Sequence, residues 1–388
     1  MPSDRSTTLE ILKTLVAFPT VSRDSNLALI DWAEDRLTAL GAACRRTWHT
    51  GGAKANLLAS FGPLELPGLV LSGHTDVVPV DGQAWSSDPF TVTERGGRLY
   101  GRGTADMKTF VAACLAFAPE IAKAKLRMPV HFSFSHDEEL GCTGVRSLIE
   151  DLANLPAVPK MAIIGEPTMM KPMLAHKGKV NVRVQVKGFE CHSSLAPTGV
   201  NAIEYACELI AFLKALARKK KAEGPFDTLF DIAHTTVHTG LIEGGTALNI
   251  VPQDCWFDFE IRAVPGDDRM ALLEEVKAYA RERLEPEMKA VHPECGFSWT
   301  ILSSVPGSNT PPEDPLAQMV KDLAGADGFG KVAFGTEAGL FQTRWGMATV
   351  ICGPGDIDHA HKPDEYIEAA QIAACEGFFA RLLARLSA

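Results

Sequence analysis

Side chains able to bind a metal ion follow strand-like segments at five separated places in the sequence. These places hold His74 with Asp76, Asp106, the pair Glu138 and Glu139, Glu166, and His361. Two histidines and five carboxylates are more ligands than one ion needs. Such a mixed nitrogen and oxygen set suits a pair of zinc-like ions that share a bridging carboxylate. The pattern indicates a metal-dependent hydrolase.

Adjacent residues within these places can divide the work between them. His74 would be a ligand, and Asp76 two residues later would hold the imidazole in one tautomer, although a lone His-x-Asp is often a structural hydrogen bond. Of Glu138 and Glu139, one can bind metal while the other faces the substrate as a general base. The alternative is that both simply begin a helix, where the dipole favours them.

At the remaining three places the local sequence gives different indications. Asp106 lies in a Gly-rich turn, where Asp is common for conformational reasons. Glu166 directly follows the apolar run Ala162–Gly165, which is unusual for a solvated surface Glu. His359 and His361 form His-x-His near the C-terminus, and position alone does not choose between them.

The elements that must position these residues alternate between strands and helices in the first half of the chain. Apolar runs at 56–61, 69–72, 130–135 and 161–164 predict strands, and helical patterns cover 7–17, 26–40, 107–123 and 145–155. This alternation predicts an α/β fold, with a mostly parallel mixed sheet covered by helices on both faces. In such sheets ligands gather at the carboxyl ends of the strands, where His74, Asp76, Glu138, Glu139 and Glu166 fall.

A different pattern begins near Lys177-Gly178. Residues 180–186 alternate apolar and polar side chains with period two, and a β-α-β-β-α-β order follows to about residue 303. We therefore expect a catalytic metal-binding domain of residues 1–177 and 305–388. An inserted α+β domain, residues 178–304, is expected to serve as a lid and dimerisation surface.

Composition excludes several classes of function. The chain has 388 residues and a net charge of −10, which argues against nucleic acid or an anionic membrane as a partner. Nine scattered cysteines fit free thiols in a reducing compartment, and residues 1–20 resemble neither a signal peptide nor a membrane span. The sequence therefore predicts a cytoplasmic protein.

Four segments together resemble one known family. They are Ser-Gly-His-Thr-Asp-Val-Val-Pro, Gly-Arg-Gly-Thr-Ala-Asp-Met-Lys, Asp-Glu-Glu-Leu-Gly-Cys-Thr-Gly and Gly-Glu-Pro-Thr. In this order they resemble the dinuclear zinc metallopeptidase/deacylase family of M20 type, which contains acetylornithine deacetylase, succinyl-diaminopimelate desuccinylase and aminoacylase-type enzymes. The similarity runs from about residue 10 to the C-terminus.

The resemblance implies a role for each matching residue. It implies that His74 and Glu166 hold one divalent ion, that Glu139 and His361 hold the other, and that Asp106 bridges them. Asp76 would orient His74, Glu138 would be the general base, and the Asp106–Met107 peptide bond would be cis. His361 is preferred to His359 because His-Lys-Pro-Asp-Glu-Tyr-Ile resembles the family's C-terminal ligand motif.

Residues outside the metal set are also implied. The segment Gly188–Ser194 is similar to one whose histidine, here His192, reaches a partner subunit's active site and helps to hold the oxyanion. Asn249 and Arg262 would contact the substrate carboxylate. Glu337 would meet a substrate ammonium, or would instead bind backbone N–H groups at a strand end.

The segments 335–341 and 351–355 look most like the acetylornithine deacetylase branch. The resemblance thus implies hydrolysis of N2-acetyl-L-ornithine by a homodimer with two divalent ions, Zn²⁺ or alternatively Co²⁺, in arginine biosynthesis. A desuccinylase, an aminoacylase or a dipeptidase of the same family is the second hypothesis. A non-catalytic binder of amino acids or metal is the third, and it has no need for the general base Glu138.

Overall fold

The structure is a computed structural model that describes residues 7–388, and these residues form two compact units. The main unit holds the described residues up to His176 together with Ser308–Lys331 and Thr336–Ala388. The inserted unit consists of Lys177–Gly307 and Val332–Gly335. The expected insertion of residues 178–304 differs from this division by a few residues and lacks the short segment Val332–Gly335.

A nine-stranded mixed sheet forms the centre of the main unit, in the order β1-β2-β6-β3-β7-β15-β8-β13 with β14 beside β8. The four middle strands, β6, β3, β7 and β15, run parallel. Toward the edges of the sheet the pairing is antiparallel, between β1 and β2, β2 and β6, β15 and β8, and β8 and β13. The strands are β1 (Ala43–Trp48), β2 (Ala55–Phe61), β3 (Leu69–His74), β6 (Val130–Ser135), β7 (Met161–Pro167), β8 (Met173–His176), β13 (Ser308–Asn309), β14 (Gly330–Val332) and β15 (Ala348–Gly353). The predicted α/β class is confirmed.

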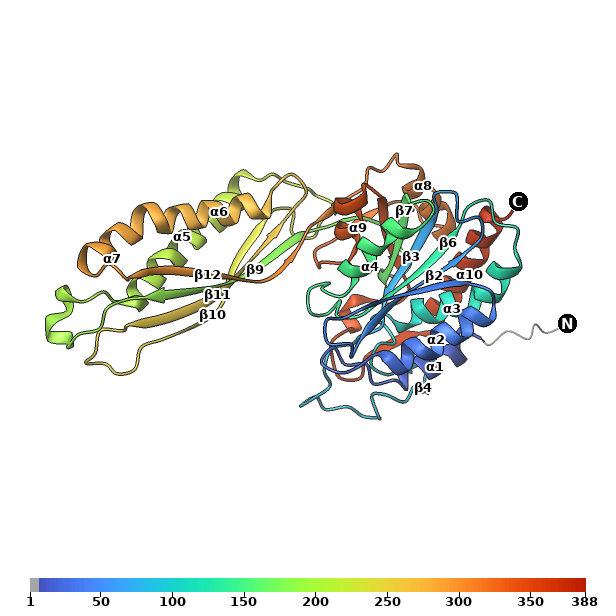
Figure 1. The fold of residues 1–388 in the computed structure, drawn as a ribbon, viewed down its shortest axis with the longest axis horizontal. Helices are drawn as coiled ribbons and strands as arrows, with labels where there is room; N and C mark the ends of the chain where they lie inside the picture. Colours follow the sequence, from blue (N-terminus) through green and yellow to red (C-terminus); the bar gives the residue numbers. More distant parts are fainter. Residues whose placement is uncertain (1–6) are drawn as a thin grey trace. The chain divides into compact units, whose positions relative to one another are not determined.

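Helices cover both faces of this sheet (Figure 1), because its central strands are apolar on both sides. They are α1 (Thr8–Val16), α2 (Leu27–Ala39), α3 (Lys108–Lys123), α4 (Val145–Asp151), α8 (Pro315–Ala324), α9 (Ala338–Trp345) and α10 (Ala369–Leu386). A separate small sheet joins β4 (Thr93–Arg95), β5 (Arg98–Tyr100) and β16 (Tyr366–Glu368). None of the helices in residues 7–388 is long and apolar enough to cross a membrane.

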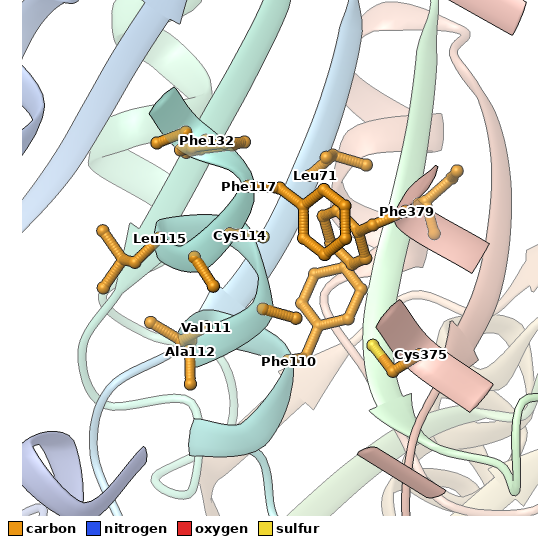
Figure 2. Packing of buried hydrophobic residues seen from close by; sticks show 14 of the residues in the cluster. Leu71, Phe110, Val111, Ala112, Cys114, Leu115, Phe117, Phe132, Cys375 and Phe379 are labelled. Carbon is orange, nitrogen blue, oxygen red and sulfur yellow. The ribbon is translucent and has the colours of Figure 1, made fainter. Parts of the chain in front are cut away.

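The core of the main unit holds α3 firmly against the sheet. Figure 2 shows Phe110 and Phe117 of α3 beside Phe379 of α10, with ring centroids 5.6 and 5.3 Å apart. Leu71 of β3 lies in the same cluster. Because α3 begins two residues after Asp106, this packing fixes the turn that carries that carboxylate.

The inserted unit contains a four-stranded antiparallel sheet in the order β10-β11-β9-β12. Its elements are β9 (Gly178–Lys187), α5 (Ala202–Glu223), β10 (Thr236–Gly244), β11 (Asp254–Ala263), α6 (Arg269–Tyr279), α7 (Glu285–Val291) and β12 (Gly296–Val305). Alternate residues of β9 and β11 are buried under α5 and α6, as the period-two pattern predicts. The predicted β-α-β-β-α-β order is present, with α7 added after α6.

Candidate active site

Three neighbouring parallel strands bring the predicted ligands to one edge of the main sheet. His74 is the last residue of β3, Glu166 lies near the end of β7, and Glu138 and Glu139 follow the end of β6. β3 pairs with β6 on one side and with β7 on the other. Residues separated by more than sixty positions in the sequence therefore meet at the carboxyl edge.

His74 is fixed by both of its ring nitrogens. Nδ1 lies 2.8 Å from the backbone carbonyl oxygen of Asp76, and Nε2 lies 2.9 Å from Oδ1 of Asp106. Both partners are hydrogen-bond acceptors, so both ring nitrogens donate. Although burial opposes it, the hydrogen bond to Asp106 raises the pKa of His74 well above its usual value. With Nδ1 committed to the carbonyl, Nε2 is the nitrogen that a metal can use.

The carboxylate of Asp76 has a different task from the one expected. Its Oδ1 is 3.7 Å from Nδ1 of His74, beyond hydrogen-bond reach, and the backbone carbonyl of Asp76 orients the imidazole instead. The carboxylate accepts the backbone N–H groups of Glu138 at 3.1 Å and Glu139 at 3.3 Å, and the Ser22 hydroxyl at 2.7 Å. Asp76 thus holds the segment that carries the two glutamates.

Asp106 joins the two histidines. Its Oδ1 faces Nε2 of His74 at 2.9 Å, and its Oδ2 faces Nε2 of His361 at 3.0 Å. Burial acts against the charged form, but the hydrogen bonds from His361 and His74 lower the pKa of Asp106 below its usual value. The Asp106–Met107 bond is cis, as expected. An ionised carboxylate with one oxygen toward each histidine has the geometry of a bridging ligand.

Glu138 and Glu139 lie in a turn, in which the N–H groups of Gly141 and Cys142 both donate to the Glu138 carbonyl. Oε1 of Glu139 is 3.1 Å from Nε2 of His361. Oε1 of Glu138 instead accepts from the Cys142 thiol at 3.0 Å. Burial raises the pKa of Glu138 to about 8, and burial with the nearby Asp106 charge raises that of Glu139.

Glu166 is only 4% exposed, and its carboxylate makes no hydrogen bond within residues 7–388. Burial, reinforced by Asp106 and Glu138, raises its pKa well above the usual value. A buried carboxylate without a donor is costly unless a proton or a cation neutralises it. A buried carboxylate of this kind fits the role of a metal ligand at this edge.

The structure separates His361 from His359. His361 faces Asp106 and Glu139, and these hydrogen bonds raise its pKa to about 10. His359 packs on Tyr366 with ring centroids 4.1 Å apart and is hydrogen-bonded to the tyrosine hydroxyl at 2.8 Å. Only His361 belongs to the cluster.

The donor atoms of this cluster form two overlapping sets of metal-ligand type. Within each set they lie within 4.8 Å of one another; the sets are His74, Glu138, Glu166 and His74, Asp106, Glu139. His361 adjoins the second set through Asp106 and Glu139. The acidic excess, the imidazole nitrogens and the unpartnered Glu166 fit borderline divalent metal ions such as zinc.

His192, Asn249 and Arg262 belong to the inserted unit. The Ser194 N–H can only donate to Nδ1 of His192, at 3.2 Å, so Nε2 carries the ring proton and faces solvent. The Ser193 N–H donates to the Asn249 carbonyl at 3.0 Å, which places these two segments together. The Arg262 guanidinium is paired with Glu260 at 2.9 Å and donates weakly to the Ala333 carbonyl at 3.5 Å, so a substrate carboxylate must compete with Glu260.

Glu337 does not occupy a position from which it can meet a substrate ammonium. It is 1% exposed, directly before α9, and its two oxygens accept from the hydroxyls of Ser72, at 2.8 Å, and Ser135. The other expectation, that it binds backbone N–H groups, is also incorrect, since serine hydroxyls take that place. Glu337 joins the ends of β3 and β6 just below His74 and Glu138.

Three residues near the site had no role in the sequence interpretation. Cys142 contacts Glu138, and Arg102 forms a fully buried ion pair with Glu365. All three lie inside the motifs that carry the family resemblance, which was the available signal. Burial of a charged pair is a property of the fold that a single sequence does not display.

Comparisons with known proteins agree with this geometry. The sequence pattern of peptidase family M20/M25/M40 matches residues 70–385. The aminopeptidase PepT of Bacillus cereus is similar in structure, with a TM-score of 0.76 and 20% identity, over 98% of each chain.

Two further structures show the same fold. An M20 family metallo-carboxypeptidase of Sulfolobus solfataricus has a TM-score of 0.75 and 18% identity, over 97% of this chain and 98% of its own. The YXEP protein of Bacillus subtilis, described as a dinuclear metal-binding peptidase from the M20 family, has a TM-score of 0.67 and 14% identity over 98% and 97%. The present chain belongs to peptidase family M20/M25/M40, a family of metal-dependent hydrolases.

Proposed function

We propose that this protein is a dinuclear metal-dependent amidohydrolase that removes the acetyl group from an N-acetylated amino acid, with N2-acetyl-L-ornithine as the substrate. The observation that carries the proposal is the cluster of metal-ligand groups, in which the carboxyl group of Glu138 lies outside the contacts that join Asp106 to the two histidines. A binding protein has no use for such a group, whereas hydrolysis of an amide requires a proton carrier.

His74 and Glu166 would hold one divalent ion, Glu139 and His361 the other, and Asp106 both. We propose zinc for both positions, with cobalt as the alternative. When bound there, the ions supply Lewis acidity, which polarises an acyl oxygen and makes a water molecule more acidic. The backbone carbonyl of Asp76 keeps the Nε2 atom of His74 directed into the site.

Glu138 would transfer the proton. It removes a proton from the attacking water as the water oxygen bonds to the acyl carbon, and it returns that proton to the amine nitrogen as the C–N bond breaks. The products from acetylornithine are acetate and ornithine. Burial raises the pKa of Glu138, which suits a carboxyl group that must accept a proton and later return it.

His192 would stabilise the negative charge that develops on the acyl oxygen. Its Nε2–H is a solvent-facing donor of the kind that an oxyanion hole needs. We propose that a second copy of the chain supplies it, in a homodimer formed through the inserted unit. Asn249 and Arg262 would bind the substrate carboxylate, with Arg262 exchanging Glu260 for the substrate.

The choice of acetylornithine rests on the resemblance of residues 335–341 and 351–355 to the acetylornithine deacetylase branch. The buried position of Glu337 removes one expected contact to the ornithine ammonium. A desuccinylase, an aminoacylase or a dipeptidase would use the same metal site and the same proton transfer.

Comparison of kcat/KM on four substrates tests the proposal. The metal-loaded enzyme should be assayed on N2-acetyl-L-ornithine, succinyl-diaminopimelate, N-acetylmethionine and an unmodified dipeptide. The highest kcat/KM on acetylornithine supports the proposal. A higher value on any of the other three reassigns the substrate, and no hydrolysis of any of them contradicts the amidohydrolase mechanism.

A further inference from the structure

A buried ion pair lies beside the metal-ligand cluster. Nη1 of Arg102 is 2.6 Å from Oε2 of Glu365, and their side chains are 0% and 1% exposed. Burial of both charges carries a large desolvation penalty, which a single ion pair often fails to offset. The other hydrogen bonds of Arg102 and Glu365 connect the pair to the metal-ligand cluster.

The second oxygen of Glu365 holds the turn that carries Asp106. Oε1 accepts the backbone N–H of Ala105 at 2.9 Å and the N–H of Asp106 itself at 3.1 Å. These two bonds fix the peptide planes on the N-terminal side of Asp106, while the packing of α3 fixes the chain after it. The direction of the Asp106 carboxylate therefore depends on Glu365.

The second amino group of Arg102 reaches toward the other side of the cluster. Nη2 donates to Oε1 of Gln83 at 2.7 Å, and the Trp85 indole N–H donates to the same oxygen at 3.0 Å. The amide nitrogen of Gln83 then donates to the backbone carbonyl of His361 at 3.4 Å. The guanidinium also lies over the Trp85 ring, 5.1 Å from its centroid.

We propose that Arg102 and Glu365 are positioning residues that set Asp106 and, through Gln83, His361 in place for metal binding. The inference rests on the proposed dinuclear site and deepens it. One connected hydrogen-bond network reaches the backbone of Asp106 at one end and the backbone of His361 at the other. These two proposed ligands come from loops more than 250 residues apart in the sequence. Arginine suits the centre of the network because its planar fork can bond two acceptors and still stack on an aromatic ring.

The test measures zinc affinity, by calorimetric titration of metal-stripped protein, and does not depend on activity. Glu365→Gln retains an oxygen for the two N–H groups but directs an amide toward the Arg102 fork. We expect zinc affinity to fall about 10–100-fold, the usual effect of losing a group that orients metal ligands. Asp364→Asn is the matched control: it changes the neighbouring carboxylate, which accepts from Ser86, and zinc affinity should be unchanged.

Two more variants keep the test decisive if Glu365→Gln folds poorly. Gln83→Met, at a half-buried loop residue, removes the whole branch from Arg102 through Gln83 to His361 and leaves the bonds of Glu365 to the Asp106 turn in place; it should weaken zinc binding by about 10-fold. Arg102→Lys keeps the charge and should not restore wild-type affinity, since an ammonium lacks the planar fork.

The outcomes separate this inference from the proposed function. If the wild-type protein binds zinc and the affinity is unchanged in Glu365→Gln, Gln83→Met and Arg102→Lys, the positioning role is overturned. The proposed metal site is not affected by that result. Wild-type protein that binds no divalent ion overturns both. A loss of affinity in Asp364→Asn equal to that in Glu365→Gln also contradicts the positioning role, because it indicates a general effect of altering this loop.

Discussion

The two units of the molecule prepare their candidate residues in opposite ways. In the main unit, His74, Asp106 and Glu166 are at most 5% exposed and lie at the ends of strands and helices that the core holds in place. In the inserted unit, His192 and Asn249 lie exposed on loops, beside Leu248, which is 102% exposed. Folding of the main unit fixes the geometry of the first group. The environment of the second group depends on the substrate or protein surface that contacts it.

This difference has an energetic basis. Several buried carboxylates close together repel one another and lose hydration, so the main unit forms the site at a cost that protons or metal ions must offset. The raised pKa values of Glu138, Glu139 and Glu166 record that cost. The exposed side chains of His192 and Asn249 carry no comparable desolvation penalty. They can contribute binding energy only when a contact removes them from water.

The largest expected effect comes from the main unit, at the proton carrier. Glu138→Gln should keep fold and metal content while kcat falls by about 10²–10⁴-fold, because an amide cannot accept and return a proton. Steady-state kinetics with metal analysis of the same sample measures both quantities. Glu65→Gln, at an exposed position, is the control. Activity within a few-fold of wild type would remove Glu138 from this role.

A smaller effect is expected from the inserted unit. His192→Ala should lower kcat by about 10²-fold, as for the loss of one oxyanion donor, without changing metal content. His238→Ala, at another exposed histidine of the same unit, should leave kcat unchanged. Equal losses in the two variants would indicate a general disturbance of the unit instead of a role for His192.

Mixed dimers sharpen the comparison between the units. If His192 acts across a dimer, inactive Glu138→Gln and His192→Ala chains should regain activity after subunit exchange, because one site of the mixed dimer has both residues intact. No recovery despite demonstrated exchange would exclude donation by a second chain.

The smallest expected effect is at Cys142. Burial raises the pKa of this thiol well above its usual value, so the thiol stays protonated and donates to Glu138. Cys142→Ala should reduce kcat about 2–10-fold, corresponding to a net hydrogen bond of about 0.5–1.5 kcal/mol. Cys142→Ser retains a donor and should lie closer to wild type. If Cys142→Ala and Cys142→Ser give the same kcat, the hydrogen bond from Cys142 to Glu138 does not contribute to catalysis.

The sequence predicted the strands that carry the site better than the strand at the edge of the main sheet. The apolar strands that end at His74, Ser135 and Pro167 are visible as runs, and the rule that ligands gather at the carboxyl ends of parallel strands did the rest. Strand β1 was missed, because its six residues are all exposed or half-buried and show no continuous apolar run.

Side-chain direction was the part that the sequence did not reveal. Asp76 was expected to orient His74 through its carboxylate, yet two residues on a turn place the carbonyl closer than the carboxylate. Glu337 was expected near substrate, and only the fold shows that Ser72 and Ser135 surround it. The contacts of Glu337 join residues more than two hundred positions apart, so the local sequence pattern gives no indication of them.

The central claim is that one cluster in the main unit holds two metal ions that work together. Metal-stripped protein should be titrated with zinc near neutral pH while bound zinc and hydrolytic activity are recorded on the same samples. The account predicts two ions per chain at saturation, with full activity reached only when both are bound, and loss of all activity on chelation. Saturation at a single ion with full activity would contradict it.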